Sequence, residues 1–425
     1  MEQLIIRGGC PLRGEVTIHG AKNSALPLLA ATLLGHGVSE IHNCPRLSDV
    51  CTSMAILSHL GCRARRQGDT VTVDATAPCG CDIPDALMRE MRSSIVFLGA
   101  ITARCGEATL SYPGGCELGP RPIDLHLAAL RRLGAVIEER HGTIRCQAPH
   151  GLHGATISLP FPSVGATENV VLAACTATGT TVLRHAAREP EIRDLCAFLN
   201  ACGAHIHAAQ DGTLTIEGVP SLRAGEYSVM PDRIETATYL AAAAATGGEL
   251  LLRRCCPEDA APAFPPLETG GCCIRTEADS IAITAPPRPG KLGTVRTMPY
   301  PGFPTDAGAP LLATACVADG TSVFVENIFE NRYKYVDELA RMGARVQVDG
   351  RVAVVEGVEF LQGAAVECTD LRGGAALVVA GLAAHGDTTV TALHHLDRGY
   401  EGLESSLRAV GADVRRIPEE SNKAE

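Results

Sequence analysis

The segment from Ser111 to His126 carries the residues best suited to chemistry. It reads SYPGGCELGPRPIDLH, and its glycines and prolines exclude a helix or a central strand, so we expect an exposed loop. It presents the thiol of Cys116 together with Arg121, Asp124 and the histidine. A cation near an exposed thiol stabilises the thiolate form of cysteine. The segment therefore predicts a reactive thiol. From these residues alone, the alternative is an incidental loop cysteine.

Lys22 and Asn23 stand where an apolar helix is expected to begin. They follow Gly20 in the segment HGAKNSALP. The first turn of a helix offers unpaired N–H groups and a positive potential, and a lysine there adds a full charge. The segment predicts an anion site, although most lysines at such positions bind no ligand.

Further polar groups lie at helix starts and strand ends. The segment FPSVGATENV is a turn that opens a helix and exposes the backbone of residues 163–165. Charged clusters in AAREPEI, MPDRIET and FENR are more often solvated ion pairs than catalysts. Their matching positions along the chain nevertheless favour a lined cleft. These charged residues are Arg188, Glu189, Glu191, Asp232, Arg233, Glu235, Glu330 and Arg332.

Aspartates and arginines recur in three segments of the C-terminal half. Asp306 lies in PYPGFPTDAG, Asp370 and Arg372 lie in CTDLRGG, and Arg398 lies in HHLDRGY. A carboxylate in a loop rich in proline and glycine is a candidate general base. By itself this pattern identifies Asp306 only as a candidate.

These segments belong to a sixfold internal repeat. In each copy a helical stretch ends in a turn of small residues, and a strand follows. A glycine just after the last helical residue is typical of a left-handed C-cap. The glycines at this point are Gly61, Gly134, Gly203, Gly271, Gly343 and Gly411, which lie 68–73 residues apart. A strand that begins with glycine also recurs six times. Six small α/β units grouped three and three predict two similar domains.

The fourth repeat departs from the pattern. Where the others carry an amphipathic helix, it reads PEDAAPAFPPLETGG, with Pro262, Pro265 and Pro266. Proline in a helix interior costs roughly 3 kcal/mol. We therefore expect this helix to be broken or replaced by a loop.

Composition narrows the possible classes of function. At 425 residues the chain exceeds the usual size of one core, which favours two domains. The net charge of −11 and the absence of Trp argue against a general nucleic-acid binder. No secretory signal or membrane-spanning stretch is apparent. The 18 cysteines lie mostly among apolar residues and lack CxxC pairs, which predicts structural thiols in a reducing cytosol rather than a zinc site.

Taken together and in this order, the segments resemble the UDP-N-acetylglucosamine 1-carboxyvinyltransferases of the enolpyruvyl transferase family. The resemblance runs from about Leu4 to Arg415. It rests on GAKN at 20–23, PGGCxxGxRPIDLH at 113–126, PSVGATEN at 162–169, AAREPEI at 186–192, MPDRIET at 230–236, PGFPTD at 301–306, FENR at 329–332, TDLR at 369–372 and HxxDRGYE ending at Glu401. As a set these motifs are specific, because chance does not place so many in register.

The resemblance implies an α/β fold. The expected architecture is a two-domain inside-out α/β barrel built from six βαβαββ-type repeats of about 70 residues, three per domain. One domain is expected over residues 22–230 and the other over residues 1–21 plus 231–425. The active site is expected in the cleft between them.

The implied reaction transfers the enolpyruvyl group of phosphoenolpyruvate to the 3′-hydroxyl of UDP-N-acetylglucosamine and releases phosphate, as the first committed step of peptidoglycan synthesis. Cys116 matches the proton donor of the family, which also forms a phospholactoyl adduct and is alkylated by fosfomycin. Asp306 matches the group beside the attacking hydroxyl. Lys22, Asp370 and Arg398 complete the catalytic set. Phosphoenolpyruvate would be held by Lys22, Asn23, Arg121, Arg372 and Arg398.

The resemblance also implies the remaining contacts. The residues expected to bind the sugar nucleotide are Arg92, Arg121, Pro122, Ile123, Asp124, Leu125, Ser163, Val164, Gly165, Asp306 and Ile328. Glu189, Asp232 and Asp370 are expected to fasten the closed state. No metal, organic cofactor, nucleic acid or membrane is required, and a cytoplasmic monomer is expected.

One departure from the family pattern affects the expected site. Many members carry Met-Gln-x-Gln after the aspartate of PGFPTD, whereas this chain has Ala307–Pro310. The change allows a catalytically retired paralogue that senses a sugar nucleotide. A second alternative, the shikimate-pathway enolpyruvyl transferase, lacks the PGGC loop and the PSVGATEN turn. A purely structural repeat protein would not need the charged segments.

Overall fold

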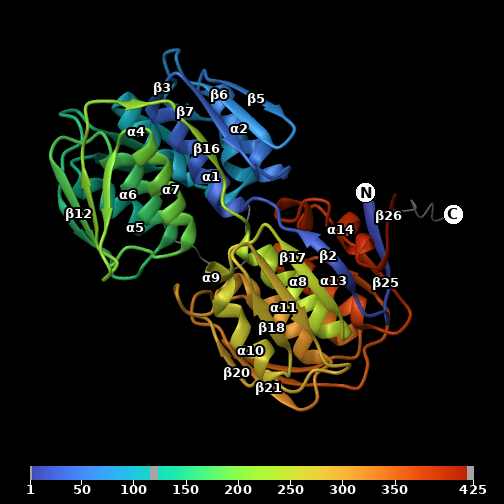
Figure 1. Ribbon diagram of the computed structural model, residues 1–425. Coiled ribbons are helices and arrows are strands. Elements are labelled where there is room, and N and C mark those ends of the chain that lie inside the picture. Colours follow the sequence, from blue (N-terminus) through green and yellow to red (C-terminus); the bar gives the residue numbers. More distant parts are fainter. Residues whose placement is uncertain (1, 115–122, 419–425) are drawn as a thin grey trace. The chain divides into compact units, whose positions relative to one another are not determined.

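The computed structural model describes residues 2–114 and 123–418. The chain forms two compact units (Figure 1). One contains the N-terminal residues up to His19 and the chain from Pro231 onward. The other runs from Gly20 to Met230. Each unit is described by itself below.

The unit between Gly20 and Met230 holds three four-stranded sheets of one design. In each, a short edge strand runs parallel to the strand that begins next to a glycine, and the remaining strands are antiparallel. The first sheet is β16 (Glu226–Ser228), β4 (Val38–His42), β6 (Thr70–Asp74) and β5 (Arg63–Gln67). The second is β7 (Asp82–Ile83), β8 (Glu107–Ser111), β10 (Thr143–Gln147) and β9 (Val136–Arg140). The third is β11 (Thr156–Ser158), β12 (Thr180–Arg184), β14 (Leu214–Glu217) and β13 (His205–Ala208).

The other unit repeats this design three more times. Its first sheet is β2 (Arg13–Thr17), β17 (Glu249–Arg253), β19 (Ser280–Thr284) and β18 (Cys273–Thr276). Its second is β20 (Thr294–Arg296), β21 (Thr321–Val325), β23 (Val352–Glu356) and β22 (Arg345–Asp349). Its third is β24 (Ala365–Glu367), β25 (Asp387–Thr391), β1 (Glu2–Arg7) and β26 (Asp413–Pro418).

Strands that are distant in sequence complete three of these sheets. The edge strand β2 pairs with β17, with Arg13 opposite Glu249. The N-terminal strand β1 lies between β25 and β26, with Leu4 opposite Val390 and Ile5 opposite Arg415. In the other unit β16 supplies the edge of the first sheet, with Glu226 opposite Glu40. In each unit, a strand from one end of the unit's chain therefore completes a sheet that is formed at the other end.

Three buried helices occupy the centre of each unit. They are α1 (Lys22–Ala31), α4 (Phe97–Cys105) and α6 (Val164–Ala174) in one unit, and α8 (Arg233–Thr246), α11 (Thr305–Cys316) and α13 (Leu371–Ala383) in the other. Helices α8, α11 and α13 pack against one another in pairs, and α4 packs on both α1 and α6 (Figure 1). A helix that is apolar on all sides must be buried. The predicted inside-out α/β architecture is thus confirmed, with separate sheets around the helices rather than a closed barrel.

Outer helices follow the glycine-led strands and are buried on one side. They are α2 (Ser48–His59), α5 (Asp124–Arg132), α7 (Pro190–Ala201), α12 (Val336–Arg341) and α14 (Leu403–Ala409). In the fourth repeat the corresponding segment is split into α9 (Pro257–Ala260), the 3₁₀ turn η3 (Ala261–Ala263) and α10 (Phe264–Thr269). The predicted break is confirmed. The chain remains helical in short pieces because the prolines fall in first turns, where their missing N–H has no helical partner.

Short elements connect these parts. They are β3 (Gly35–His36), which pairs with β15 (Leu222–Arg223), helix α3 (Asp85–Glu90), and the 3₁₀ turns η1 (Thr32–Leu34), η2 (Arg92–Val96) and η4 (Leu396–Arg398). Among the described residues, no helix is long and apolar enough to cross a membrane.

The repeated glycines adopt the predicted left-handed conformation. All six have φ between 89° and 103°, and each directly precedes the turn into a strand. An alanine at such a backbone position costs about 1–2 kcal/mol. The repeat is therefore visible in the sequence because one backbone conformation is needed six times.

We expect Gly343→Ala to lower the free energy of unfolding by about 1–2 kcal/mol. Gly343 has a φ of 89°, and a Cβ there would meet no atom within 4 Å, so the loss would come from the backbone alone. Gly308→Ala is the matched control in the same unit. Its Cβ would also meet no atom within 4 Å, but it lies inside helix α11, so a gain of roughly 0.5–1 kcal/mol is expected. Chemical denaturation of both variants checks this, and equal shifts in one direction would contradict it.

Candidate functional site

Lys22 is the first residue of α1, and no side chain caps that helix. The lysine is 8% exposed, and its Nζ lies 3.2 Å from Oδ2 of the buried Asp49. The carboxylate fixes the ammonium group at a helix start, where the helix dipole already gives a positive potential. Asn23 follows in the first turn and is half-buried. This arrangement suits the binding of an anion.

Asp194 holds the first turn of α1 in place. It comes from α7 and accepts hydrogen bonds from the hydroxyl of Ser24, from the phenol of Tyr227 at 2.7 Å and from the N–H of Met230 at 3.2 Å. Burial raises the pKa of Asp194, while these donors favour its charged form. Asp194 was missed by sequence reasoning, because an aspartate in an amphipathic helix usually faces water.

The turn of Ser163, Val164 and Gly165 is built on a buried histidine. Ser163 caps α6, and its Oγ accepts from the N–H of Ala166 at 3.4 Å. A Cβ at Gly165 would lie only 2.8 Å from Cε1 of His126, so the glycine allows the imidazole to lie against the turn. The amide of Asn169 donates to Nδ1 of His126 at 2.8 Å. The expectation of an exposed loop up to His126 is therefore wrong at its end, because α5 begins at Asp124 and buries the histidine.

We expect the stability of the chain to fall in mild acid because of His126. Burial, together with the charge of Arg92, lowers its pKa from 6.5 to about 4. The unfolded chain therefore binds this proton first, so stability is lost as the pH falls from about 6.5 towards about 4, by roughly 3 kcal/mol in all.

His126→Gln is the variant that isolates this effect. Glutamine can still accept from Asn169 but does not titrate. We expect the stability advantage of the parent over the variant to shrink by roughly 2–3 kcal/mol between about pH 7 and about pH 4.5. Chemical denaturation at several pH values measures this. Parallel pH profiles for the two proteins would rule out the assignment.

Other residues expected to bind the sugar nucleotide lie near the starts of helical elements in the same unit. Arg92 begins η2 and donates from Nη1 to the carbonyl of Pro113 at 3.3 Å. Asp124 is exposed in the first turn of α5, Ile123 is buried and Leu125 is half-buried. Cys116, Arg121 and Pro122 lie outside the described residues.

Glu189 lies beside a buried group of carboxylates. It is the N-cap residue of α7 and is half-buried. Burial, together with the charges of Glu191 and Glu189, raises the pKa of Glu168 to about 8. Glu168 is therefore mostly protonated at neutral pH. The sequence segment PSVGATEN contains this residue but gives no sign of its protonation, which depends on the packing around it.

In the other unit, Asp306 lies between two buried arginines at the start of α11. Its Oδ1 accepts from Nη2 of Arg332 at 2.8 Å, and its Oδ2 accepts from Nε and Nη2 of Arg372 at 3.2 and 3.1 Å. The arginine side chains are 4% and 3% exposed, whereas that of Asp306 is 27% exposed. The carboxylate is thus held by charge-assisted bonds while it remains accessible. Sequence reasoning noticed Arg332 but did not assign it to Asp306.

Asp370 and Asp232 are N-caps of the two neighbouring inner helices. Oδ1 of Asp370 accepts from the N–H groups of residues 372 and 373 at 3.0 and 3.1 Å. Oδ1 of Asp232 accepts from those of residues 234 and 235 at 2.8 and 3.0 Å. Such caps contribute about 0.5–2 kcal/mol. Both aspartates therefore stabilise the start of a helix. The resemblance additionally implies a catalytic role for Asp370 and closing contacts for both.

Arg398 and Ile328 lie in short connecting segments of the same unit. Arg398 ends η4 and is half-buried. The preceding Asp397 accepts from Arg416 of β26 at 2.6 and 3.1 Å, which fixes that turn. Ile328 is half-buried after β21, and its N–H donates to Glu326 at 2.7 Å.

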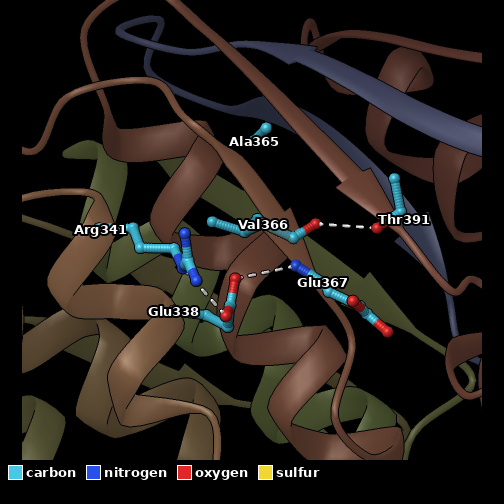
Figure 2. A pocket seen from close by; sticks show the side chains of 6 residues that line it. All are labelled: Glu338, Arg341, Ala365, Val366, Glu367 and Thr391. Atoms are coloured by element: carbon cyan, nitrogen blue, oxygen red, sulfur yellow. Dashed lines mark hydrogen bonds and ion pairs between the residues drawn. The ribbon is translucent and has the colours of Figure 1, made fainter. Parts of the chain in front are cut away.

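A pocket of about 220 Å³ lies beside α12 and is lined by Glu338, Arg341, Ala365, Val366, Glu367 and Thr391 (Figure 2). Its polar groups are bonded to one another. Glu338 accepts from Nε of Arg341 at 3.1 Å and from the N–H of Glu367 at 3.0 Å. None of the residues expected from the sequence to act on a substrate lines it. We therefore do not assign the candidate site to this pocket.

Most described cysteines are unsuited to chemistry. Ten are buried, and burial raises the pKa of Cys316 and of Cys368 to about 12. A buried thiol that stays protonated is a poor nucleophile. Over residues 2–114 and 123–418, no group of His, Cys, Asp and Glu is placed to hold a metal ion. The burial of ten thiols agrees with the prediction that most cysteines are structural.

Comparison with known proteins identifies the class of enzyme to which the chain belongs. Residues 6–407 match the family model described as EPSP synthase (3-phosphoshikimate 1-carboxyvinyltransferase). The fold resembles the enolpyruvyl transferase NikO from Streptomyces tendae, with a TM-score of 0.88, 28% identity and coverage of 98% and 99% of the two chains. It also resembles EPSP synthase from Acinetobacter baumannii, with a TM-score of 0.74, 17% identity and coverage of 98% and 100%. These matches define a carboxyvinyl-transferring enzyme, and the chain belongs to the EPSP synthase family of enolpyruvyl transferases.

Curated relatives place the chain more narrowly within this family. It is 52% identical to UDP-N-acetylglucosamine 1-carboxyvinyltransferase 2 of Caldanaerobacter subterraneus subsp. tengcongensis, covering 98% of this chain and all of the relative. It is 49% identical to UDP-N-acetylglucosamine 1-carboxyvinyltransferase 1 of Symbiobacterium thermophilum, covering 98% and 95%. The resemblance inferred from the nine motifs is confirmed.

Proposed function

We propose that this enzyme transfers the enolpyruvyl group of phosphoenolpyruvate to the 3′-hydroxyl of UDP-N-acetylglucosamine and releases phosphate, in peptidoglycan synthesis. The observation that carries this proposal is 46–52% identity over nearly the whole chain to relatives of that name. The shikimate-pathway alternative has less support, since EPSP synthase from Acinetobacter baumannii is similar in fold but only 17% identical.

The proposed chemistry is addition followed by elimination. In the addition, a proton is transferred to the methylene carbon of phosphoenolpyruvate, the sugar oxygen bonds to the adjacent carbon, and the hydroxyl proton leaves to a base. In the elimination, the same methyl group loses a proton, the double bond forms again, and phosphate departs with the electrons of its C–O bond. We assign Cys116 as the proton donor to carbon and Asp306 as the base near the hydroxyl, with Asp370 assisting.

The position of Asp306 supports its assignment. A carboxylate is too weak a base to deprotonate an alcohol fully, so proton removal must accompany attack. Such concerted transfer needs an acceptor with a fixed direction. The hydrogen bonds from Arg332 and Arg372 fix the carboxylate, and its 27% exposure leaves it open to a substrate. Because both arginines already bond to Asp306, Arg372 acts on the substrate only if it shares or leaves this contact.

Charge complementarity supports the proposed phosphoenolpyruvate contacts. This substrate carries about three negative charges, and Lys22 offers an ammonium group at the positive end of α1. We assign Asn23, Arg121, Arg372 and Arg398 to the same substrate. We assign the sugar nucleotide to Arg92, to residues 121–125 and 163–165, and to Ile328, as the resemblance implies.

Other features implied by the resemblance stay predictions. They are alkylation of Cys116 by fosfomycin, closing contacts from Glu189 and Asp232, the cytoplasmic location and the monomeric state. The division into domains at 22–230, with an active site shared between them, also stays a prediction. The proposed reaction itself needs no metal or organic cofactor.

A phosphate-release assay tests the proposal. The purified chain is incubated with phosphoenolpyruvate and UDP-N-acetylglucosamine, and shikimate 3-phosphate replaces the sugar nucleotide as the control acceptor. We expect release only with the sugar nucleotide. Release with shikimate 3-phosphate instead would overturn the assignment of the acceptor.

One observation keeps a second candidate function, a sugar-nucleotide sensor. Residues 307–310 replace the polar amides of many family members and lie buried in α11, with Pro310 inside the helix. They are buried, however, and Asp306 keeps both arginine partners. Binding of the sugar nucleotide without any phosphate release would favour the sensor.

A further inference from the structure

Glu326 is a buried carboxylate that the reaction scheme does not use. It follows β21 directly and is 2% exposed. Its Oε1 accepts from the hydroxyl of Thr297 at 3.0 Å and from the N–H groups of Ile328 and Phe329 at 2.7 and 3.0 Å. Its Oε2 accepts from the hydroxyl of Thr305 at 2.8 Å. Both oxygens of this carboxylate therefore act as acceptors, and all four partners donate to them.

Two of these partners are connected to Asp306. Thr305 precedes Asp306 in the chain, and its carbonyl accepts from Nη2 of Arg332 at 3.2 Å. The ring of Phe329 lies 5.5 Å from the guanidinium of Arg332. The same Nη2 donates to Oδ1 of Asp306 at 2.8 Å. Glu326 thus fixes both the start of the helix that carries Asp306 and the turn that supports its arginine partner.

This corner differs from the equivalent corners of the other repeats. The residue that follows the glycine-led strand adopts a positive φ in four of the six repeats, at Asn43, His185, Arg254 and Ala392, with φ between 51° and 56°. Glu326 does not adopt a positive φ. Here the chain turns by donating backbone N–H groups to the carboxylate instead. The residue after the strand of the second repeat, Tyr112, also lacks a positive φ, so it is the carboxylate that distinguishes the corner at Glu326.

We propose that Glu326 is a positioning residue for Asp306, acting through Thr305 and through the turn that supports Arg332. The inference rests on the proposed function for its kinetic consequence, because Asp306 is assigned there as the base. A small displacement of a reacting group costs about a hundredfold in rate. Loss of the Thr305 connection should therefore lower kcat and leave binding of the sugar nucleotide nearly unchanged.

Thr305→Val tests the connection directly, because valine keeps the shape and removes the hydroxyl donor. We expect kcat for phosphate release to fall about ten- to a hundredfold, with the dissociation constant of UDP-N-acetylglucosamine changed less than about threefold. Thr305→Ser restores the donor and should recover most of the rate. Thr314→Val is the control in the same helix, because the Thr314 hydroxyl donates to the carbonyl of Ala241 at 3.0 Å and not to Glu326, and it should lower kcat less than about threefold. Equal losses in both valine variants, or no loss in Thr305→Val, would overturn the proposal.

A second measurement separates this inference from the proposed function. Hydrogen exchange at the N–H groups of Ile328 and Phe329 is followed in the parent and in Glu326→Gln, together with the melting temperature. The amide of glutamine cannot accept from all four donors. We expect exchange to accelerate about tenfold at these two positions with little change in the unit's other strands. If the parent releases no phosphate, the proposed function fails, but the exchange measurement still tests the role of Glu326. Unchanged exchange at Ile328 and Phe329 would overturn the proposal for Glu326.

Discussion

Asp306→Asn is expected to lower kcat for phosphate release by about 10²–10⁴, the range of a lost general base. Asparagine is nearly the same size and can still accept from one arginine, but its amide is not a useful proton acceptor. In the parent, Oδ1 and Oδ2 accept from Arg332 and Arg372. The substitution therefore also removes the negative charge that compensates these two buried guanidinium groups. We expect the free energy of unfolding to fall by about 1–3 kcal/mol. The loss is limited because Asp306 is partly exposed, so solvent screens its charge.

Steady-state kinetics and denaturation of the same preparation separate these two effects. Asp387→Asn is the matched control, since Asp387 pairs with Arg7 at 2.8 Å in the same unit, but both side chains are exposed. That variant should keep the parent rate. If Asp306→Asn retained more than about a tenth of the parent kcat, Asp306 would not be the base.

Cys116→Ser is expected to produce the second large loss, again about 10²–10⁴ in kcat. Protonation of the methylene carbon needs an acid that gives up its proton readily, and a serine hydroxyl is a much weaker acid than a thiol. The variant should also fail to form the phospholactoyl adduct and should resist inactivation by fosfomycin. Both covalent changes would need the sulfur as nucleophile.

The control for Cys116 is Cys273→Ser, because Cys273 is an exposed thiol on β18. It should leave the rate, the adduct and the inactivation as in the parent. Intact-protein mass measurement after exposure to fosfomycin reads the covalent change directly. Modification that persists in Cys116→Ser would show that another residue is the target.

The repeat architecture could be read from the sequence because it depends on local backbone needs. Gly343 and its five counterparts must adopt a positive φ, which few other residues tolerate, so the same letter recurs. The broken fourth helix follows equally from the fixed geometry of proline. Lys22 could be located because it stands before an apolar helix, whereas Asp306 was noticed as a carboxylate in a loop rich in proline and glycine.

The supports of the site could not be read in this way. Asp194 and Glu326 look like ordinary polar residues in the sequence, and only the tertiary fold brings Ser24 or Thr305 to them. His126 was expected in an exposed loop, but α5 begins two residues earlier and buries it. Asp370 carries a capping role that the chemistry of the site does not require. For Asp194, Glu326 and His126 the deciding contact joins residues distant in sequence, whereas the Asp370 cap is local.

The central claim is the identity of the acceptor and of the transferred group. Mass spectrometry of the sugar nucleotide after incubation with the chain and phosphoenolpyruvate tests it most directly. We expect UDP-N-acetylglucosamine to gain one carboxyvinyl group, with one phosphate released per molecule of product. A sugar nucleotide recovered unchanged, from protein that is folded and binds it, would contradict the account.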